Sequence, residues 1–168
     1  MAFADALLPE YDHEMSTTRR LLDRLPESKL GWKPHEKSMS LGLLASHIAE
    51  VPRWTGAITG SDSFDLAPPG GPAYTPPVFK SRTEVLRQFD QNVQTARGMI
   101  AKLADAQWMK PWTLLKGGKP VFTMPKAGVL RSMILSHSIH HRGQLSVYLR
   151  LNNVPLPQVY GPTADEGM

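Results

Sequence analysis

The stretch "LSHSIHHRGQLSVYLR" (135–150) decides how this sequence is interpreted, because it holds three of the six histidines of the 168-residue chain. On a helix with about 100° per residue, His137 and His141 lie about 40° apart, inside the apolar stripe. His140 lies at the border of that stripe. The pattern predicts an amphipathic helix whose buried face carries two imidazole rings.

Two histidines four positions apart on a helix can direct their ring nitrogens to one metal ion. His47 lies between Leu44 and Ile48 on the apolar face of another predicted helix. If these two helices pack at the usual ~8–10 Å, three imidazoles meet in the interior. Three neutral imidazoles leave coordination positions open to water or substrate, as in catalytic metal sites. The alternative is that each ring is a hydrogen-bonded residue of the core.

Apolar residues at steps of three and four predict four long helices in total. One runs from about Phe3 to Leu25, and one begins at the N-cap Ser40, breaks at Pro52 and resumes near Trp54. The other two helices cover 81–103, which starts with a Ser-x-x-Glu capping box, and about 125–151.

The connections between the helices complete the predicted fold. Residues 59–80 are rich in proline and glycine and predict an extended crossover, whereas 112–125 predicts a β-hairpin around Gly117 and Gly118. We therefore expect one all-α domain, residues 1–168, in the form of a four-helix bundle. A long crossover loop joins its second and third helices, and a small β-hairpin precedes the fourth.

The composition excludes several classes of function. The chain has no cysteine, so disulfides, thiolate nucleophiles and cysteine-ligated metal clusters are excluded, and any metal must use His, Asp, Glu or backbone oxygen. The net charge is +4, but the basic residues are scattered, so we expect no nucleic-acid partner. The sequence has no apolar run of roughly 18 residues and no basic start typical of a signal peptide, so we expect no membrane partner and a cytoplasmic location.

Three polar residues near the histidines are candidates for catalytic roles. Gln144, one turn beyond His141, can orient a ligand of the metal, or it can bond the crossover loop instead. Tyr148 can donate a proton or can be a packed tyrosine of the core. Glu50, three residues after His47, can act as a general base or be a solvated carboxylate on the helix surface.

Other residues allow two interpretations each. Arg142 can hold an anionic substrate or form a surface ion pair. Trp54 and Trp108 can line the mouth of a pocket or belong to the core. His13 and His35 fall on a helix surface and in a loop, so we expect both to be solvated.

Four stretches, in their order along the chain, make it resemble the DinB/YfiT-like family of small four-helix-bundle proteins. The most specific is "HSIHHRGQLSVYLR" (137–150), which is similar to the family's motif of His, three residues, His, then Arg-Gly-Gln. The stretch "WKPHEKSMSLGLLASHIAEVPRW" (32–54) resembles the part that carries the family's first histidine. The other two stretches are "TRRLLDRLPE" (18–27) and "VYGPTADE" (159–166).

The resemblance implies that His47, His137 and His141 bind one divalent metal ion, nickel or zinc, and that the protein is a cytoplasmic homodimer. The wider superfamily includes enzymes that use low-molecular-weight thiols, such as mycothiol-dependent maleylpyruvate isomerase and bacillithiol transferases. We therefore expect a metal-dependent enzyme, either a transferase that uses an external thiol or a hydrolase, acting on a small-molecule electrophile. The alternative is a non-catalytic metal-binding protein of stress response or interaction. Sharing a fold and three ligands does not define the reaction.

Overall fold

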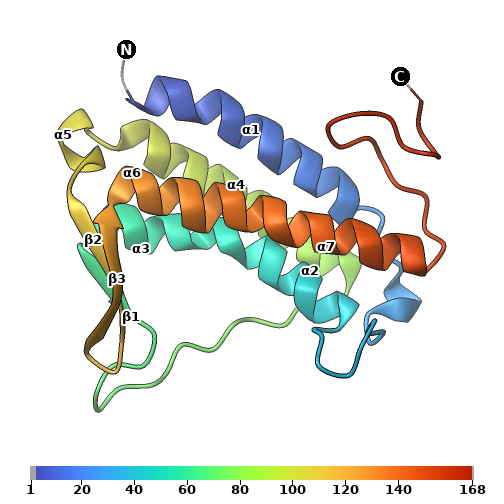
Figure 1. The fold of residues 1–168 in the computed structure, drawn as a ribbon, viewed down its shortest axis with the longest axis horizontal. Helices are drawn as coiled ribbons and strands as arrows, with labels where there is room; N and C mark the ends of the chain where they lie inside the picture. The colour runs from blue at the N-terminus through green and yellow to red at the C-terminus, as the bar shows by residue number, and fades with distance from the viewer. Residues whose placement is uncertain (1–2, 168) are drawn as a thin grey trace.

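The computed structural model describes residues 3–167. In it, four long helical segments lie side by side (Figure 1). These segments are α1 (Phe3–Leu22), α2 (Leu41–Glu50) with its continuation α3 (Thr55–Gly60), α4 (Arg82–Lys102), and α6 (Lys126–Val129) with its continuation α7 (His137–Leu151). Helix α1 packs against α4 and α7, and α2 packs against the same two helices. The two helices that carry the histidines are therefore neighbours, as predicted.

The helix starts follow local signals in the sequence. The Ser40 side-chain oxygen accepts a hydrogen bond from the Leu43 backbone N–H at 3.2 Å, and Ser81 does the same for Glu84 at 3.1 Å. The predicted break at Pro52 is confirmed, because the 3-10 turn η2 (Val51–Trp54) separates α2 from α3. Helix α1 ends at Leu22, before the expected end at Leu25, although Leu25 is still buried.

The last long helix is continuous in extent but not in geometry. Between α6 and α7, Leu130–Ser136 forms a π-helical stretch, η3, directly before His137. The apolar pattern of the sequence predicts a regular α-helix in this region. A π-helical stretch adds residues to each turn, and such stretches are frequent at functional sites. Here it ends at the first of the two histidines of α7.

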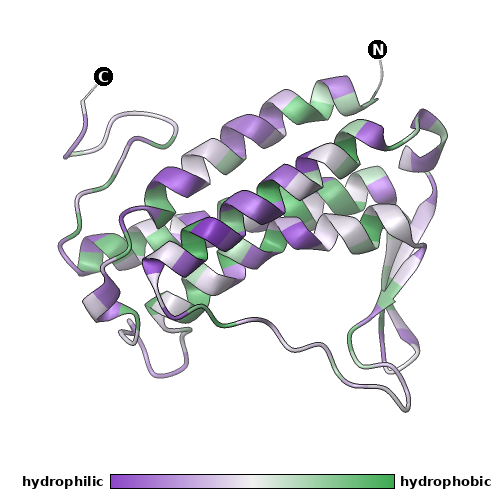
Figure 2. Cartoon of the chain, turned by 180° about the vertical axis from the view of Figure 1, so that it is seen from behind, coloured by the Kyte–Doolittle hydropathy of each residue, from purple (hydrophilic) through white to green (hydrophobic). Residues whose placement is uncertain are grey.

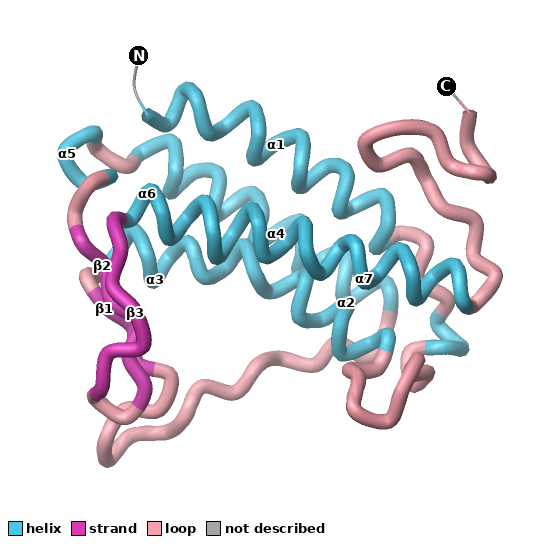
Figure 3. Tube along the Cα trace, in the orientation of Figure 1, coloured by secondary structure: helices cyan, strands magenta, loops and turns pink. Residues whose placement is uncertain are grey.

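A small three-stranded mixed sheet lies at one end of the helices (Figure 3). The predicted hairpin is confirmed as β2 (Pro111–Lys116) and β3 (Lys119–Pro125), with Gly117 and Gly118 at positive φ in the turn. The third strand, β1 (Ser63–Asp65), pairs in parallel with β2. The Asp65 carboxylate accepts hydrogen bonds from the turn amides of Gly117 and Gly118 at 3.0 and 2.7 Å. Strand β1 corrects the expected all-α class with a lone hairpin, since the crossover itself joins the sheet.

Two short helical elements complete the fold. The 3-10 turn η1 (Glu27–Lys29) follows α1, and helix α5 (Asp105–Trp108) precedes the hairpin. Hydrophilic and hydrophobic residues alternate along the helices (Figure 2), and the apolar faces of all the long segments meet in one core cluster that includes Tyr11, Leu44, Phe89 and Leu145. Within residues 3–167, no helix combines the length and the hydropathy that crossing a membrane requires.

Candidate metal centre

The three predicted ligand histidines meet in the structure. His47 is in α2, and His137 and His141 are in the first turns of α7. The His137 Nε2 atom lies 2.8 Å from His47 Nε2 and 2.9 Å from His141 Nε2. One ligand atom from each of the three residues lies within 4.8 Å of the other two, which is close enough for one ion to contact all three. The prediction that these residues form one cluster is confirmed.

Gln144 determines which nitrogen of His141 faces the cluster. Its side-chain carbonyl oxygen lies 2.7 Å from His141 Nδ1. Because that oxygen only accepts hydrogen bonds, Nδ1 carries the proton and donates it, and Nε2 keeps its lone pair. A ligand histidine commonly makes such a bond with its outer nitrogen, which orients the ring. Gln144 therefore positions His141, and it does not bond the crossover loop.

Burial keeps the imidazoles neutral near pH 7. Burial, with a smaller contribution from the neighbouring His141, lowers the pKa of His47 to about 4. Burial likewise lowers the pKa of His137 to about 4, with smaller contributions from His141, His47 and His140. The pKa of His141 is also lowered by burial, against an opposing effect of the Gln144 hydrogen bond. The neutral ring is the form that binds metal.

The geometry of the cluster fits a divalent metal ion. A neutral His137 ring has at most one proton on Nε2, so it cannot donate to both neighbouring Nε2 atoms. A single cation would satisfy all three lone pairs. Tetrahedral ligands at the usual 2.0–2.1 Å from zinc lie about 3.3 Å apart, close to the spacing found here. The ligand set is nitrogen only, which zinc, nickel, copper and iron all accept.

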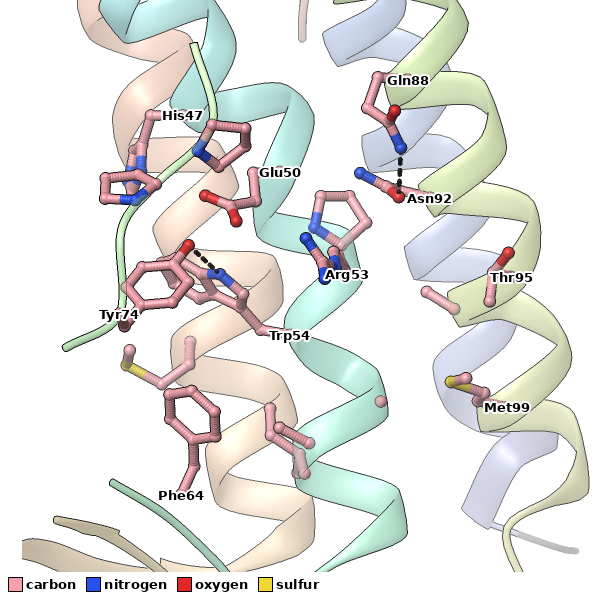
Figure 4. A pocket seen from close by; sticks show the side chains of 18 of the residues that line it. His47, Glu50, Arg53, Trp54, Phe64, Tyr74, Gln88, Asn92, Thr95 and Met99 are labelled. Carbon is pink, nitrogen blue, oxygen red and sulfur yellow. Dashed lines mark hydrogen bonds between the residues drawn. The ribbon is translucent and has the colours of Figure 1, made fainter. Parts of the chain in front are cut away.

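A large pocket begins at this cluster. Its volume is about 1020 Å³, and both His47 and Trp54 line it. The Trp54 ring stands edge-on to His47 and His137, with ring centroids 5.6 and 5.3 Å apart. Its indole nitrogen donates to the Tyr74 hydroxyl at 3.4 Å (Figure 4). Trp54 therefore lines a pocket, and the crossover that carries Tyr74 forms part of the wall.

Most of the pocket wall is apolar. Residues of α3, α4, the crossover and the sheet line it. The apolar side chains of the wall include Phe64, Leu66, Phe79, Met99, Trp112, Leu114 and Met133. A pocket of this size and character is typical of sites for small organic molecules.

Glu50 is buried in this wall, which corrects the interpretation as a solvated surface carboxylate. The residue is 1% exposed, and neither side-chain oxygen has a hydrogen-bond partner within the described residues. Burial raises the pKa of Glu50, while the Tyr74 hydroxyl and the Arg53 charge oppose that effect. In Figure 4 the carboxylate points into the space between His47 and Tyr74. Glu50 is therefore an acceptor group available to a ligand.

Arg142 matches neither of its two predicted roles. The side chain is 2% exposed and forms an ion pair with Glu14 of α1 at 2.7 Å. It also donates to the Glu14 backbone oxygen at 3.1 Å and to the Tyr160 hydroxyl. Arg142 is thus neither a surface residue nor a member of the pocket wall, because its partners lie on α1 and the C-terminal segment.

Of the other candidate residues, His140 is a neighbour of the cluster, with its ring centroid 4.8 Å from that of His141, but it is not one of the three grouped ligands. The Tyr148 ring stands edge-on to Trp32 with centroids 5.5 Å apart, so its catalytic role stays a prediction without a contact to the site. Trp108 is 1% exposed and stacks on Phe3, which makes it a core residue. His13, His35 and His140 are exposed, as predicted for the first two.

Comparison with known proteins identifies the family. The family model described as the DinB superfamily matches residues 10–145. The chain belongs to the DinB superfamily. A DinB-like protein from Bacillus cereus ATCC 10987 has a similar structure, with a TM-score of 0.72 and 22% identity over 93% of this chain and 97% of that one. A second DinB-like protein, YjoA from Bacillus subtilis, gives a TM-score of 0.65 and 17% identity over 97% of this chain and 99% of that one.

A curated relative covers nearly the whole chain as well. The uncharacterized protein YrdA of Bacillus subtilis (strain 168) is 25% identical over 162 residues, which is 96% of this chain and 90% of the relative. These similarities support the DinB fold along most of the chain. They do not assign a reaction to this member of the superfamily.

Sequence patterns missed Tyr74 as a residue of the DinB site. Tyr74 lies in a proline-rich crossover without periodicity, and it reaches the pocket only because the chain there passes α2 and α3. Its pKa is raised to about 12, mainly by burial and also by its interaction with Glu50. The only signal available in the sequence was an aromatic residue in a proline-rich connection that also holds Phe64 and Phe79.

Proposed function

We propose that this DinB-superfamily protein binds one divalent metal ion, nickel or zinc, through His47, His137 and His141, and that it is a metal-dependent enzyme. The observation that supports this proposal is the convergence of three Nε2 atoms beside an apolar pocket of about 1020 Å³. Three protein ligands leave the ion accessible to substrate, and the pocket gives the substrate a place to bind.

The residues of the chain have distinct roles in this proposal. A divalent ion held by three neutral imidazoles supplies Lewis acidity, which activates water in a hydrolase or an external thiol in a transferase. Gln144 fixes the orientation of His141, and Trp54 shields one side of the ligand rings. Glu50 can accept a proton from a reacting group in the pocket, because its oxygens have no other partner among the described residues.

The two reaction types can be separated by their need for a thiol. A thiol transferase of this sequence must take its thiol from a low-molecular-weight co-substrate, since the chain has none. The metal-loaded protein should be assayed with a panel of thiols and small electrophiles, and with esters and amides for hydrolysis. Turnover that needs both metal and thiol identifies a transferase, and turnover with water alone identifies a hydrolase. Metal binding without turnover supports the alternative, a non-catalytic stress-response or interaction protein.

Metal content tests the site itself. We expect purified protein to carry about one divalent ion per chain by elemental analysis, and His137→Ala to lose most of it, since its Nε2 contacts both other ligand atoms. His140→Ala is the matched control, because His140 is exposed and outside the cluster. Wild-type protein without metal after purification in the absence of chelators, or equal loss in both variants, contradicts the proposal.

The resemblance to the family also leads us to propose a homodimer. Size-exclusion chromatography with light scattering on the metal-loaded protein measures the mass directly. A mass near 18.6 kDa, that of a single chain, contradicts the dimer.

A further inference from the structure

The pocket contains a polar group whose bonding capacity is unused by the rest of the described chain. Both oxygens of Glu50 are buried, and among the described residues neither makes a hydrogen bond of ordinary length and angle, although the Tyr74 hydroxyl is near enough to act on the pKa of the carboxyl group. An ionised carboxylate offers about four acceptor positions, and leaving a buried acceptor unsatisfied costs on the order of 1–3 kcal/mol. A ligand that supplies donors to this carboxylate would remove that cost.

The neighbours of Glu50 leave most of these acceptor positions unfilled. The Asn92 amide, which also lines the pocket, is occupied, because it donates to the Ala49 backbone oxygen at 2.9 Å and accepts from Gln88 at 3.0 Å. The Tyr74 hydroxyl accepts from Trp54 and has one proton to offer, which leaves most acceptor positions of the carboxylate open. Arg53 also lines the pocket, but its side chain and Glu50 do not form an ion pair within 4.0 Å in the described structure.

Glu50 is also distinct from the metal ligands. The group of ligand atoms that lie within 4.8 Å of one another consists of the three histidines and does not include the carboxylate. The pocket therefore offers a carboxylate for donors close to His47, the histidine of the cluster that lines it. The rest of the wall is largely aromatic and aliphatic, with Phe64, Trp112 and Leu114 among its members, and in Figure 4 Phe64 lies beyond Tyr74 and Trp54 as seen from Glu50.

We propose that the ligand of this pocket is a primary or secondary organic amine in its protonated form, with an apolar body that packs on the aromatic wall and an ammonium group that donates to Glu50. An ammonium carries two or three N–H donors and a positive charge, so it matches both the unused acceptors and the charge of the carboxylate. An anionic head group would meet repulsion at the same position. The volume of about 1020 Å³ accommodates a molecule much larger than the amine head group alone.

This inference deepens the proposed function and rests on it, since the amine is the class of substrate that the metal-dependent enzyme would take. The binding step can nevertheless be measured separately from metal binding. The probe is 3-phenylpropylamine, with 3-phenyl-1-propanol as its neutral analogue and 3-phenylpropionate as its anionic analogue. Titration calorimetry on the protein as purified, at pH 7, gives the dissociation constants, and elemental analysis of the same samples gives the metal content.

We expect the amine to bind about 10-fold to 100-fold more tightly than the alcohol, the range that a charge-assisted hydrogen bond supports. Glu50→Gln should remove this preference and leave the affinity for the alcohol unchanged. Glu36→Gln removes the same charge from an exposed loop position and should keep the preference. An amine preference that persists in Glu50→Gln, or wild-type protein that binds the amine no better than the alcohol or the propionate, overturns the proposal.

Two further outcomes separate this inference from the proposed function. If Glu50→Gln loses metal together with amine affinity, the carboxylate acts as a metal ligand and the amine proposal is overturned. If wild-type protein lacks metal but retains the Glu50-dependent preference for the amine, the metal proposal fails and the amine site stands. The comparison of the three probes on wild-type protein keeps the test valid even if the Glu50 variant does not fold.

Discussion

Two buried glutamates of this protein have opposite surroundings. Glu14, 6% exposed, forms an ion pair with Arg142 at 2.7 Å, and both of its oxygens accept from the Tyr160 hydroxyl at 3.0 and 2.9 Å. Glu50, 1% exposed, has no such partner in the described chain and lines the pocket. The first carboxylate joins α1, α7 and the C-terminal segment. Burial alone therefore does not reveal the role of a charged residue, whereas the presence or absence of partners does.

Helix α7 contributes both to the metal cluster and to the ion pair of Glu14. His141 and Arg142 are consecutive residues, so their side chains leave the helix about 100° apart. His141 faces the metal cluster, and Arg142 faces α1 and its ion pair with Glu14. The group of Arg142, Glu14 and Tyr160, whose polar atoms are paired with one another, thus holds α7 in place beside the histidine cluster.

Breaking the ion pair between Arg142 and Glu14 should have the largest effect on stability. Arg142→Met removes the buried cation and leaves the Glu14 charge without its main partner, so we expect a loss of about 3–5 kcal/mol in the free energy of unfolding. Urea denaturation followed by circular dichroism measures it. The double variant Arg142→Met with Glu14→Gln should recover part of the loss, because no unpaired charge remains. A loss below about 1 kcal/mol in the single variant would show that the ion pair does not stabilise the fold.

Removing the Gln144 side-chain oxygen that accepts from His141 should have an intermediate effect, which is on metal affinity. Gln144→Leu leaves the His141 Nδ1 proton without its partner and frees the ring orientation, so we expect metal affinity to fall about 10-fold to 100-fold. Competition with a chromophoric chelator measures the affinity. Gln94→Leu, at an exposed position of α4, is the matched control and should bind metal like the wild type. Unchanged affinity in Gln144→Leu would mean that the hydrogen bond does not position the ligand.

Neutralising Glu50 should have the smallest effect. It should stabilise the fold, whereas Arg142→Met destabilises it. Burial raises the pKa of Glu50 above its ordinary 4.5, so the folded state binds the proton more tightly than the unfolded state does. The wild type therefore loses stability as pH rises from about 4.5 through the folded-state pKa. Glu50→Gln lacks this loss and should be more stable than the wild type at pH 7, with no gain below pH 4.

Urea denaturation of both proteins at pH 4, 5, 6 and 7 checks this pH dependence. A Glu50→Gln variant that is instead destabilised by more than about 1 kcal/mol at pH 7 would show that the carboxylate has a stabilising partner in the folded protein. In that case the contrast between Glu14 and Glu50 would not hold.

Most of the helical fold was predictable, because it follows from short-range patterns. The N-caps Ser40 and Ser81, the break at Pro52 and the hairpin turn at Gly117 and Gly118 are all encoded within a few residues. The parallel strand β1 and the π-helical stretch Leu130–Ser136 were missed. A parallel strand depends on a distant partner, and the residues of a π-helical stretch follow the same apolar spacing as an α-helix.

The three ligands were predictable because periodicity assigns each histidine to a buried helix face, and only the pairing of α2 with α7 had to be assumed. The sequence left Glu50 open between a general base and a solvated carboxylate, because the crossover and α4, which line the same pocket, contribute no pattern near Glu50 itself. The Arg142 ion pair with Glu14 joins residues 128 positions apart, and the sequence offers no means to match one charge to another at that distance.

The proline-rich crossover gives the pocket a wall that is independent of the helical core. It contributes Phe64, Tyr74 and Phe79, whereas the helices contribute the imidazoles. Prolines restrict the backbone of such a segment before it folds, so the part that follows β1 keeps its path at little entropic cost although it belongs to no strand or helix. Changes in this one segment can therefore alter ligand preference without disturbing the histidines, and proteins that share the same three ligands can diverge in what they recognise.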